Sequence, residues 1–312
     1  MRLSALLPAT LAMVAVPLAA VPQQMPKIPP YHVNVRLVNV FVSVTAPNGA
    51  PIGGLTKSDF ALAEDGIPQK IAYFERDTSM PLSIVLAIDT SGSVYKDLDV
   101  ERRAAYDFVR ALLRPVDRFD LMVFNSDVEE IVPFTNNLRQ IDDGLRHLTP
   151  GPATAFYNAI WLASKRLAAR QGRKVLVVIS DGGNTVDGVT YPQALEQAVR
   201  GEAMIYSLID VPILADAGRD TAGEHAMISL SQGTGGQYYY IENGDLEDAF
   251  QQVSQDLRTQ YLISYYPSRH RTEADFRHIR VTLTSSAGPA AAGYVLRYRP
   301  GYYAPPSPPL DQ

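Results

Sequence analysis

The chain has 312 residues, of which 46% are hydrophobic and 20% are charged, and its formal net charge at pH 7 is −5. This composition is ordinary for a globular protein, and the length allows one large domain or a medium one with a smaller partner. The chain has no basic excess and no run of lysine and arginine, so we expect no nucleic-acid partner. It also contains no cysteine, which excludes disulfides, thiolate metal sites and a catalytic cysteine.

The N-terminal segment 1–20 differs in composition from the rest. Arg2 precedes an uncharged apolar run that ends in small residues near Ala19 and Ala20. This layout predicts a secretory signal peptide cleaved after Ala20, and therefore an exported protein, periplasmic or extracellular. An N-terminal membrane anchor is the alternative, because the run approaches the ~20 residues that a membrane span needs. No later segment is apolar enough to span a membrane, and we expect the Pro-rich stretch 21–32 to be an extended linker.

The segment 33–80 has a β pattern. Apolar residues alternate with polar ones through 33–44, and two further strand candidates, 59–65 and 68–76, flank an Asp65-Gly66 turn.

From residue 81 to 259 apolar strands alternate with amphipathic helices. This alternation predicts an α/β domain with a doubly wound, mostly parallel sheet and helices on both faces. The expected strands are 83–89, 118–124, 128–134, 174–180, 203–210 and 235–242, with 128–134 at or near a sheet edge, and the expected helices are 99–113, 154–170, 221–232 and 245–258.

The C-terminal segment 260–304 returns to a β pattern, with strand candidates at 260–267, 276–286 and 294–303, and we expect the tail 305–312 to be disordered. Each β flank alone is too small to bury much core. We therefore expect the two flanks to form one small β-sandwich into which the α/β domain is inserted. Two independent β appendages are the alternative.

Three loops of the α/β domain carry unusual polar residues. Asp89, Ser91 and Ser93 follow the first buried strand, Thr154 leads the second long helix, and Asp181 follows a later buried strand. In an open α/β sheet, ligands bind beyond the carboxyl ends of the parallel strands, so we expect these residues to converge. Two carboxylates and three hydroxyls are hard oxygen donors that suit Mg²⁺ or Mn²⁺. Because most of these donors are neutral, we expect the bound ion to keep a residual positive charge and to have one coordination position that is open or filled by water.

The spacing D-x-S-x-S, a distant threonine before a helix and a strand-terminal Asp-Gly together resemble the von Willebrand factor type A (VWA) domain and its metal-ion-dependent adhesion site. The resemblance covers about residues 82–259 and includes AFYNAI, SDGGNT and TGGQYYYI. It implies a divalent metal and a protein partner that presents an Asp or Glu to it. The β flanks also resemble those of exported bacterial proteins labelled VWFA-related, a resemblance that implies no general activity. The metal ligands implied by position are Asp89, Ser91, Ser93, Thr154 and Asp181.

Each of these residues also has a purely structural interpretation. Asp89 and its serines could cap the next helix, and Asp181 could be a turn residue. Thr154 could equally be an N-cap, with Thr149 and Thr185 as nearby competitors for its role as a ligand. Two further acids are interpreted as residues at the start of a helix, where the helix dipole stabilises negative charge, rather than as ligands; they are Asp97 and Asp99.

The function predicted from these observations is an exported, metal-dependent protein-binding module rather than an enzyme. A metal-dependent hydrolase using the same ion is the alternative. Such an enzyme needs a proton-transfer residue beside the metal, and His147 is the only histidine near a motif loop. A third interpretation is a structural module in which the metal holds the loops together. The five histidines form no zinc pattern, and the chain lacks G-x-S-x-G. No pattern indicates an oligomeric state.

Overall fold

The computed structural model describes six stretches of the chain, all within the unit Val35–Gln312. They are residues 37–76, 79–91, 98–210, 220–241, 245–268 and 275–304. Several predictions fall outside the described residues: the signal peptide 1–20, the linker 21–32, Ser93, Asp97, the side chain of Asp99 and the tail 305–312. Among the helices that are described, none is long and apolar enough to cross a membrane.

Six strands form the central sheet, in the order β10-β9-β8-β5-β6-β7. Neighbouring strands are parallel except β6 and β7, so β7 is an antiparallel edge strand. Every residue of β5 and β9 is buried, as expected for parallel strands covered on both faces. The strands are β5 (Leu82–Asp89), β6 (Arg118–Phe124), β7 (Val128–Thr135), β8 (Arg173–Ser180), β9 (Met204–Ile209) and β10 (Tyr238–Tyr240).

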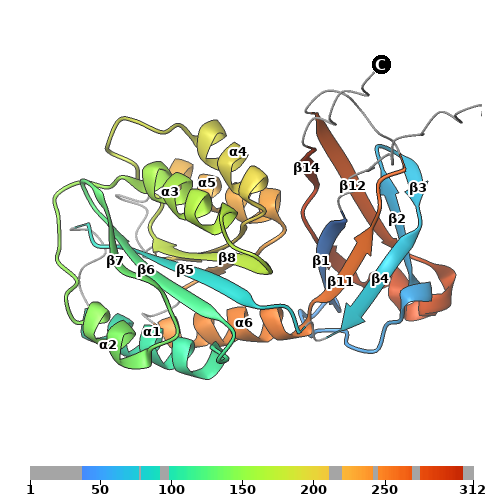
Figure 1. Cartoon of the computed structure of the whole chain (residues 1–312), viewed down its shortest axis with the longest axis horizontal. Helices are drawn as coiled ribbons and strands as arrows, with labels where there is room; N and C mark the ends of the chain where they lie inside the picture. The colour runs from blue at the N-terminus through green and yellow to red at the C-terminus, as the bar shows by residue number, and fades with distance from the viewer. Residues whose placement is uncertain are drawn as a thin grey trace, which may run out of the picture. The chain divides into compact units, whose positions relative to one another are not determined.

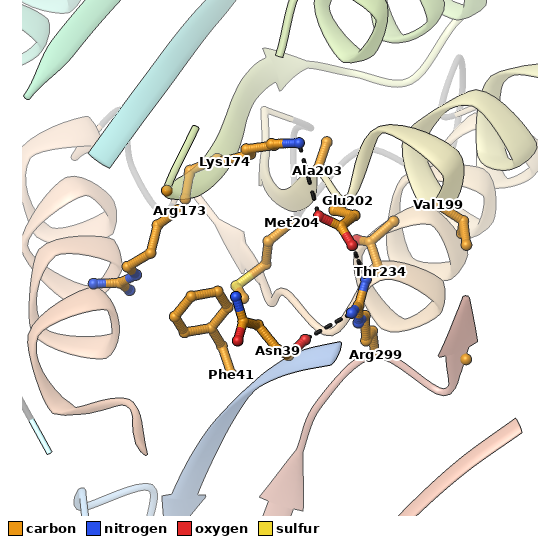
Figure 2. A pocket seen from close by; sticks show the side chains of 13 residues that line it. Asn39, Phe41, Arg173, Lys174, Val199, Glu202, Ala203, Met204, Thr234 and Arg299 are labelled. Carbon is orange, nitrogen blue, oxygen red and sulfur yellow. Dashed lines mark hydrogen bonds and ion pairs between the residues drawn. The ribbon is translucent and has the colours of Figure 1, made fainter. Parts of the chain in front are cut away.

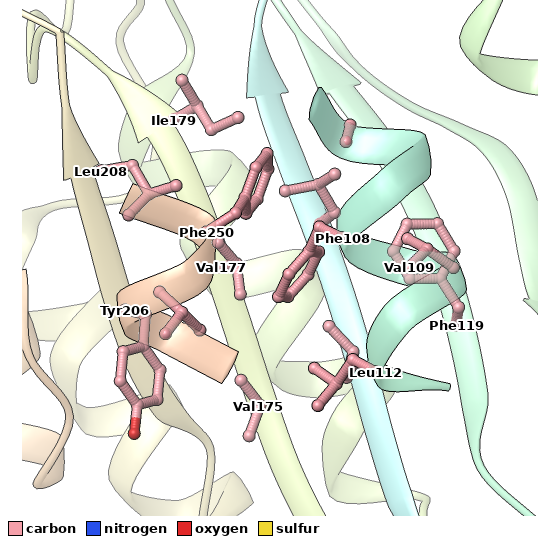
Figure 3. Packing of buried hydrophobic residues seen from close by; sticks show 14 of the residues in the cluster. Phe108, Val109, Leu112, Phe119, Val175, Val177, Ile179, Tyr206, Leu208 and Phe250 are labelled. Carbon is pink, nitrogen blue, oxygen red and sulfur yellow. The ribbon is translucent and has the colours of Figure 1, made fainter. Parts of the chain in front are cut away.

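Helices cover both faces of this sheet because alternate residues of each strand point in opposite directions. Leu86 belongs to a buried cluster with residues of α1, α2 and α6, whereas Val85 belongs to one with residues of α3, α4 and α5. Figure 1 shows these two groups of helices on opposite faces of the sheet. Figure 3 shows the first of these cores, in which Phe108 stacks on Phe250 with 4.4 Å between ring centroids. The predicted doubly wound α/β fold is confirmed. The helices are α1 (Leu98–Leu112), α2 (Leu138–Leu145), α3 (Phe156–Ala168), α4 (Tyr191–Gly201), α5 (Thr221–Thr234) and α6 (Leu246–Thr259).

The two flanks form two antiparallel sheets, ordered β13-β1-β11-β4 and β14-β12-β2-β3. In each sheet a strand from the N-terminal flank pairs with one from the C-terminal flank: β1 with β11, and β2 with β12. Both sheets contribute residues to one buried hydrophobic cluster. The strands are β1 (Val38–Thr45), β2 (Phe60–Glu64), β3 (Ile67–Gln69), β4 (Ile71–Arg76), β11 (Tyr261–Tyr265), β12 (Phe276–Leu283), β13 (Val295–Arg297) and β14 (Gly301–Tyr303), with 3₁₀ turns η1 (Lys57–Asp59), η4 (Ser285–Ala287) and η5 (Pro289–Gly293).

A single residue, Gln260, connects α6 to β11, and its side chain is buried in a polar network. The amide oxygen of Gln260 accepts a hydrogen bond from Arg173 at 2.6 Å. A small cavity of about 40 Å³ lies beside Arg173. Figure 2 shows Glu202 at this cavity between Lys174 and Arg299, with N–O distances of 3.8 and 3.4 Å. Glu202, the C-cap of α4, therefore pairs with Lys174 of β8 and with Arg299, which lies between β13 and β14.

Candidate metal centre

Asp89 is the last residue of β5, at the carboxyl edge of the sheet, and is only 1% exposed. Its Oδ1 accepts a hydrogen bond from the backbone N–H of Ser91 at 2.9 Å, and its Oδ2 accepts one from the Ser180 hydroxyl at 2.6 Å. Burial raises the pKa of Asp89; the hydrogen bonds from Ser180 and Ser91 oppose this shift, and the nearby charge of Asp181 adds to it. A cation at this edge would stabilise the ionised carboxylate.

The loop before α3 lies directly against the end of β5. Gly151 forms a parallel bridge with Ser91, and its backbone N–H donates to the Thr90 carbonyl at 3.0 Å. The side-chain amide of Asn125 donates to the Thr90 hydroxyl at 3.1 Å. The backbone carbonyl of Asn125 accepts a hydrogen bond from the N–H of Ala155 at 2.7 Å. A Cβ at position 151 would lie 2.4 Å from Cγ of Asn125, so this close approach requires glycine.

Thr154 connects this loop to the one that follows β8. Its backbone N–H donates to the Thr185 hydroxyl, and its carbonyl accepts from Thr185 N–H, both at 2.9 Å. Helix α3 begins at Phe156 with Ala155 at the N-cap, so the prediction that Thr154 leads the helix is wrong by two residues. The Thr154 side chain, 6% exposed, makes no hydrogen bond through its hydroxyl to any residue described in the structure.

Asp181 follows β8 in a tight turn. One of its carboxylate oxygens accepts a hydrogen bond from Gly183 N–H at 2.9 Å, and the other has no hydrogen-bond partner among the described residues. Gly182 has a φ of +86°, and a Cβ there would lie 2.4 Å from the carbonyl carbon of Gly223 in α5. Glycine is therefore needed to hold the Asp181 turn against the first residues of α5.

The structure brings together the loops that carry Asp89, Ser91, Thr154 and Asp181. The Thr154 hydroxyl and one Asp181 oxygen have no hydrogen-bond partner among the described residues, and with the buried Asp89 carboxylate they form a donor set that fits a hard divalent cation. In the described stretches no three or more His, Cys, Asp or Glu side chains are grouped so that they could hold a metal ion, so the fit depends on hydroxyls as well as acids.

The competing threonines have other roles. Thr185 uses its hydroxyl to accept the Thr154 N–H. Thr149 is exposed, and its carbonyl oxygen lies 3.5 Å from the Asn125 amide nitrogen. His147, the base of the hydrolase alternative, has its Nδ1 2.6 Å from the carbonyl oxygen of Asp143 in its own helix region. These contacts engage the hydroxyl of Thr185 but not that of Thr149, which differs from Thr154 in being exposed.

Sequence reasoning missed the residues that hold these loops. Ser180 donates to Asp89 and also accepts from Gly182 N–H at 3.0 Å. Asn184 accepts from the N–H of Tyr157 at 3.2 Å and so caps α3. The sequence feature that indicates Ser180 is a serine at the end of an otherwise apolar strand, at the start of SDGGNT. A hydroxyl at the carboxyl end of a parallel strand lies at the edge of the sheet where ligands bind.

The family model described as the von Willebrand factor type A domain matches residues 84–184. The match begins in β5 and ends in the loop after β8, so it includes every described residue of the candidate centre. This segment of the chain is therefore similar to a VWA domain. Such domains typically mediate protein interactions, often bind a divalent metal and are generally not enzymes.

Among individual proteins, inter-alpha-trypsin inhibitor heavy chain H1 of Mesocricetus auratus is 26% identical over 229 residues, or 65% of this chain. The alignment spans only about a quarter (25%) of that relative's length. Proximal thread matrix protein 1 from the mussel byssus, solved with a zinc-occupied MIDAS motif (the metal-ion-dependent adhesion site), has a TM-score of 0.50 at 12% identity and covers 62% of this chain and 49% of its own. An aerotolerance-related membrane protein from Bacteroides fragilis has a TM-score of 0.46 at 21% identity, and the match covers 56% of this chain and 98% of that protein's chain.

Proposed function

We propose that this chain is a divalent-cation-dependent protein-binding module. Asp89, Ser91, Ser93, Thr154 and Asp181 would hold one Mg²⁺ or Mn²⁺, and an Asp or Glu of a protein partner would complete its coordination. The observation that carries this proposal is the interlocking of three loops around the buried Asp89 carboxylate, next to oxygens of Thr154 and Asp181 that have no hydrogen-bond partner among the described residues.

The chemistry of the donor set supports an acidic partner. The five residues include only two carboxylates, so a bound divalent ion would have at most two anionic ligands from the chain, and a third could come from outside. A carboxylate is the side chain with the strongest attraction for such an ion, because hard cations prefer anionic oxygen. When bound, the ion supplies electrostatic attraction for that carboxylate, while the chain's own residues fix its position. Nothing in this arrangement requires a proton-transfer group.

A thermal melt with and without metal tests the proposal. A ligand that binds only the folded state stabilises it by RT ln(1 + [L]/Kd), about 2.7 kcal/mol at a hundredfold excess over Kd. We expect millimolar Mg²⁺ to raise the melting temperature of the wild type and to leave Asp89→Ala unchanged. Asp187→Ala, an exposed acid in the Asp181 loop, is the matched control and should respond like the wild type. Equal shifts in Asp89→Ala and the wild type would refute the site.

We also propose that the module is exported, on the basis of the charge and apolar pattern of residues 1–20. Expression of the full chain in a bacterium, followed by cell fractionation and N-terminal sequencing, would test this. Export predicts a periplasmic or extracellular protein whose first residue is Val21. A full-length protein that remains in the cytoplasm would contradict it.

A further inference from the structure

A largely apolar groove of about 570 Å³ lies along the outer side of α3. Its apolar lining comes from Trp161 and Leu162 of α3, from Val189 in the loop before α4, and from Val128 at the start of β7. Trp161 is partly exposed and belongs to none of the three buried clusters found in the described chain. Lys165 lies over its ring, 4.8 Å from the centroid. The indole is therefore a surface feature that the core does not use.

The groove is built by the same chain segments that carry the candidate metal centre. The loop that begins at Asp181 continues to Val189, whose N–H donates to Oδ1 of Asn158 at 2.9 Å and so holds this loop against α3. Val128 follows the turn of Asn125, which is hydrogen-bonded to the end of β5. The groove therefore shares the loop 181–189 and the helix after Thr154 with the candidate metal centre.

The spacing between the two features follows from helix geometry. Trp161 lies five residues after Phe156, the first residue of α3, which is about 7.5 Å along the helix axis. Thr154 precedes the helix by two residues, so the two positions are on the order of 10 Å apart. An extended peptide advances about 3.3 Å per residue, so three residues cover the same distance.

We propose that the groove receives an apolar side chain of the same partner segment whose acidic residue reaches the metal. The partner is an extended protein segment with an Asp or Glu and, three residues away, a leucine or phenylalanine. This inference rests on the proposed function and adds the specificity that a single carboxylate lacks. Burial of one such apolar side chain corresponds to an affinity gain of about tenfold to a hundredfold.

Synthetic peptides test this spacing. Each would carry one Glu in a Gly-Ser background, with one Leu placed one to five residues away on either side and a fluorescein label for anisotropy in millimolar Mg²⁺. Trp161 is the only tryptophan in the chain, so its emission gives a second readout located in the groove. We expect the tightest binding and a change in Trp161 emission at a spacing of three. Replacing that Leu by Ser should weaken binding at least about tenfold.

Two variants complete the test. Trp161→Ala should bind the Leu peptide as weakly as the wild type binds the Ser peptide, while its melting temperature still responds to Mg²⁺. Lys165→Ala, one turn further along α3, keeps the indole and should retain the preference for Leu. The proposal that one segment contacts both the metal and the groove would be overturned by either of two results. The first is a peptide affinity that does not change when the Leu is replaced, and the second is Leu-dependent binding that persists in EDTA.

The remaining outcomes distinguish the groove from the metal site. If Mg²⁺ raises the melting temperature but no peptide binds, this inference fails and the proposed metal site stands. If Mg²⁺ has no effect on the wild type, the proposed function fails first. If Trp161 emission depends on protein concentration, a second copy of the chain occupies the groove. If Trp161 emission changes when residues 305–312 are deleted, the chain's own tail occupies it. Either result would overturn the proposal.

Discussion

Asp120 provides a stability test that does not depend on the metal. It lies fully buried in β6, with its Oδ2 3.0 Å from Nε of Arg166, and Arg166 also pairs with Glu130 of β7. Burial, and then the hydrogen bond and negative charge of Glu130, raise the pKa of Asp120 from 3.8 to about 7, against the opposing effect of Arg166. The folded protein thus binds this proton more tightly than the unfolded chain does. The resulting stabilisation is complete below pH 3.8 and is lost as the pH rises through 7.

The magnitude follows from the change in proton affinity. Each tenfold change in the proton affinity of Asp120 corresponds to about 1.4 kcal/mol. The wild type should therefore lose up to about 4 kcal/mol of unfolding free energy between acidic and mildly basic pH. Asp120→Asn cannot ionise, so its stability relative to the wild type should rise across this range. Urea unfolding at pH 5 to 8.5, followed by Trp161 emission, measures the difference, and about 2.7 kcal/mol of the change should fall within this window. Asp127→Asn, an exposed acid in the β6–β7 turn, should keep the wild-type slope. The reasoning is refuted if Asp120→Asn keeps that slope too.

Two further predictions concern packing. Glu64 is buried, accepts hydrogen bonds from two tyrosines and pairs with Arg277 at 3.0 Å, so Glu64→Ala should lower the unfolding free energy by about 3 to 5 kcal/mol, measured by urea denaturation. A loss below about 1 kcal/mol would show that this network contributes little. Gly151→Val should force Asn125 away from Thr90 and weaken Mg²⁺ binding at least about tenfold by calorimetry, whereas an unchanged affinity would show that the loop contact is dispensable.

The acids of the candidate site could be predicted from the sequence because each ends a buried strand. Asp89 directly follows five apolar residues, Asp181 follows five apolar residues and Ser180, and parallel strands place such ends at one edge. Thr154 was placed too close to the helix. Its backbone groups bond to Thr185, a contact between segments 31 residues apart that no local pattern reveals. Ser180 was missed for the same reason, since its role depends on its position beside Asp89 across the sheet.

The fold followed the sequence where hydrophobic periods were long and departed from it where they were short. Helix α2 was not predicted because its eight residues include Gly144 and span only about two turns. The expected strand 294–303 is instead two short strands, β13 and β14, which pair in different sheets. Pro300 lies between them and has no N–H to donate to a sheet ladder, so a continuous strand through it is disfavoured.

The central claim is that the three loops hold a divalent ion with a coordination position left for a carboxylate from outside. Relaxation of water protons in a Mn²⁺ titration measures this most directly, because only a bound ion that keeps an exchanging water enhances relaxation strongly. We predict one Mn²⁺ per chain with strong enhancement, loss of binding in Thr154→Val but not in Thr149→Val, and reduced enhancement when a Glu-containing peptide displaces the water. The account is contradicted if Mn²⁺ does not bind, or if it binds equally well in Thr154→Val.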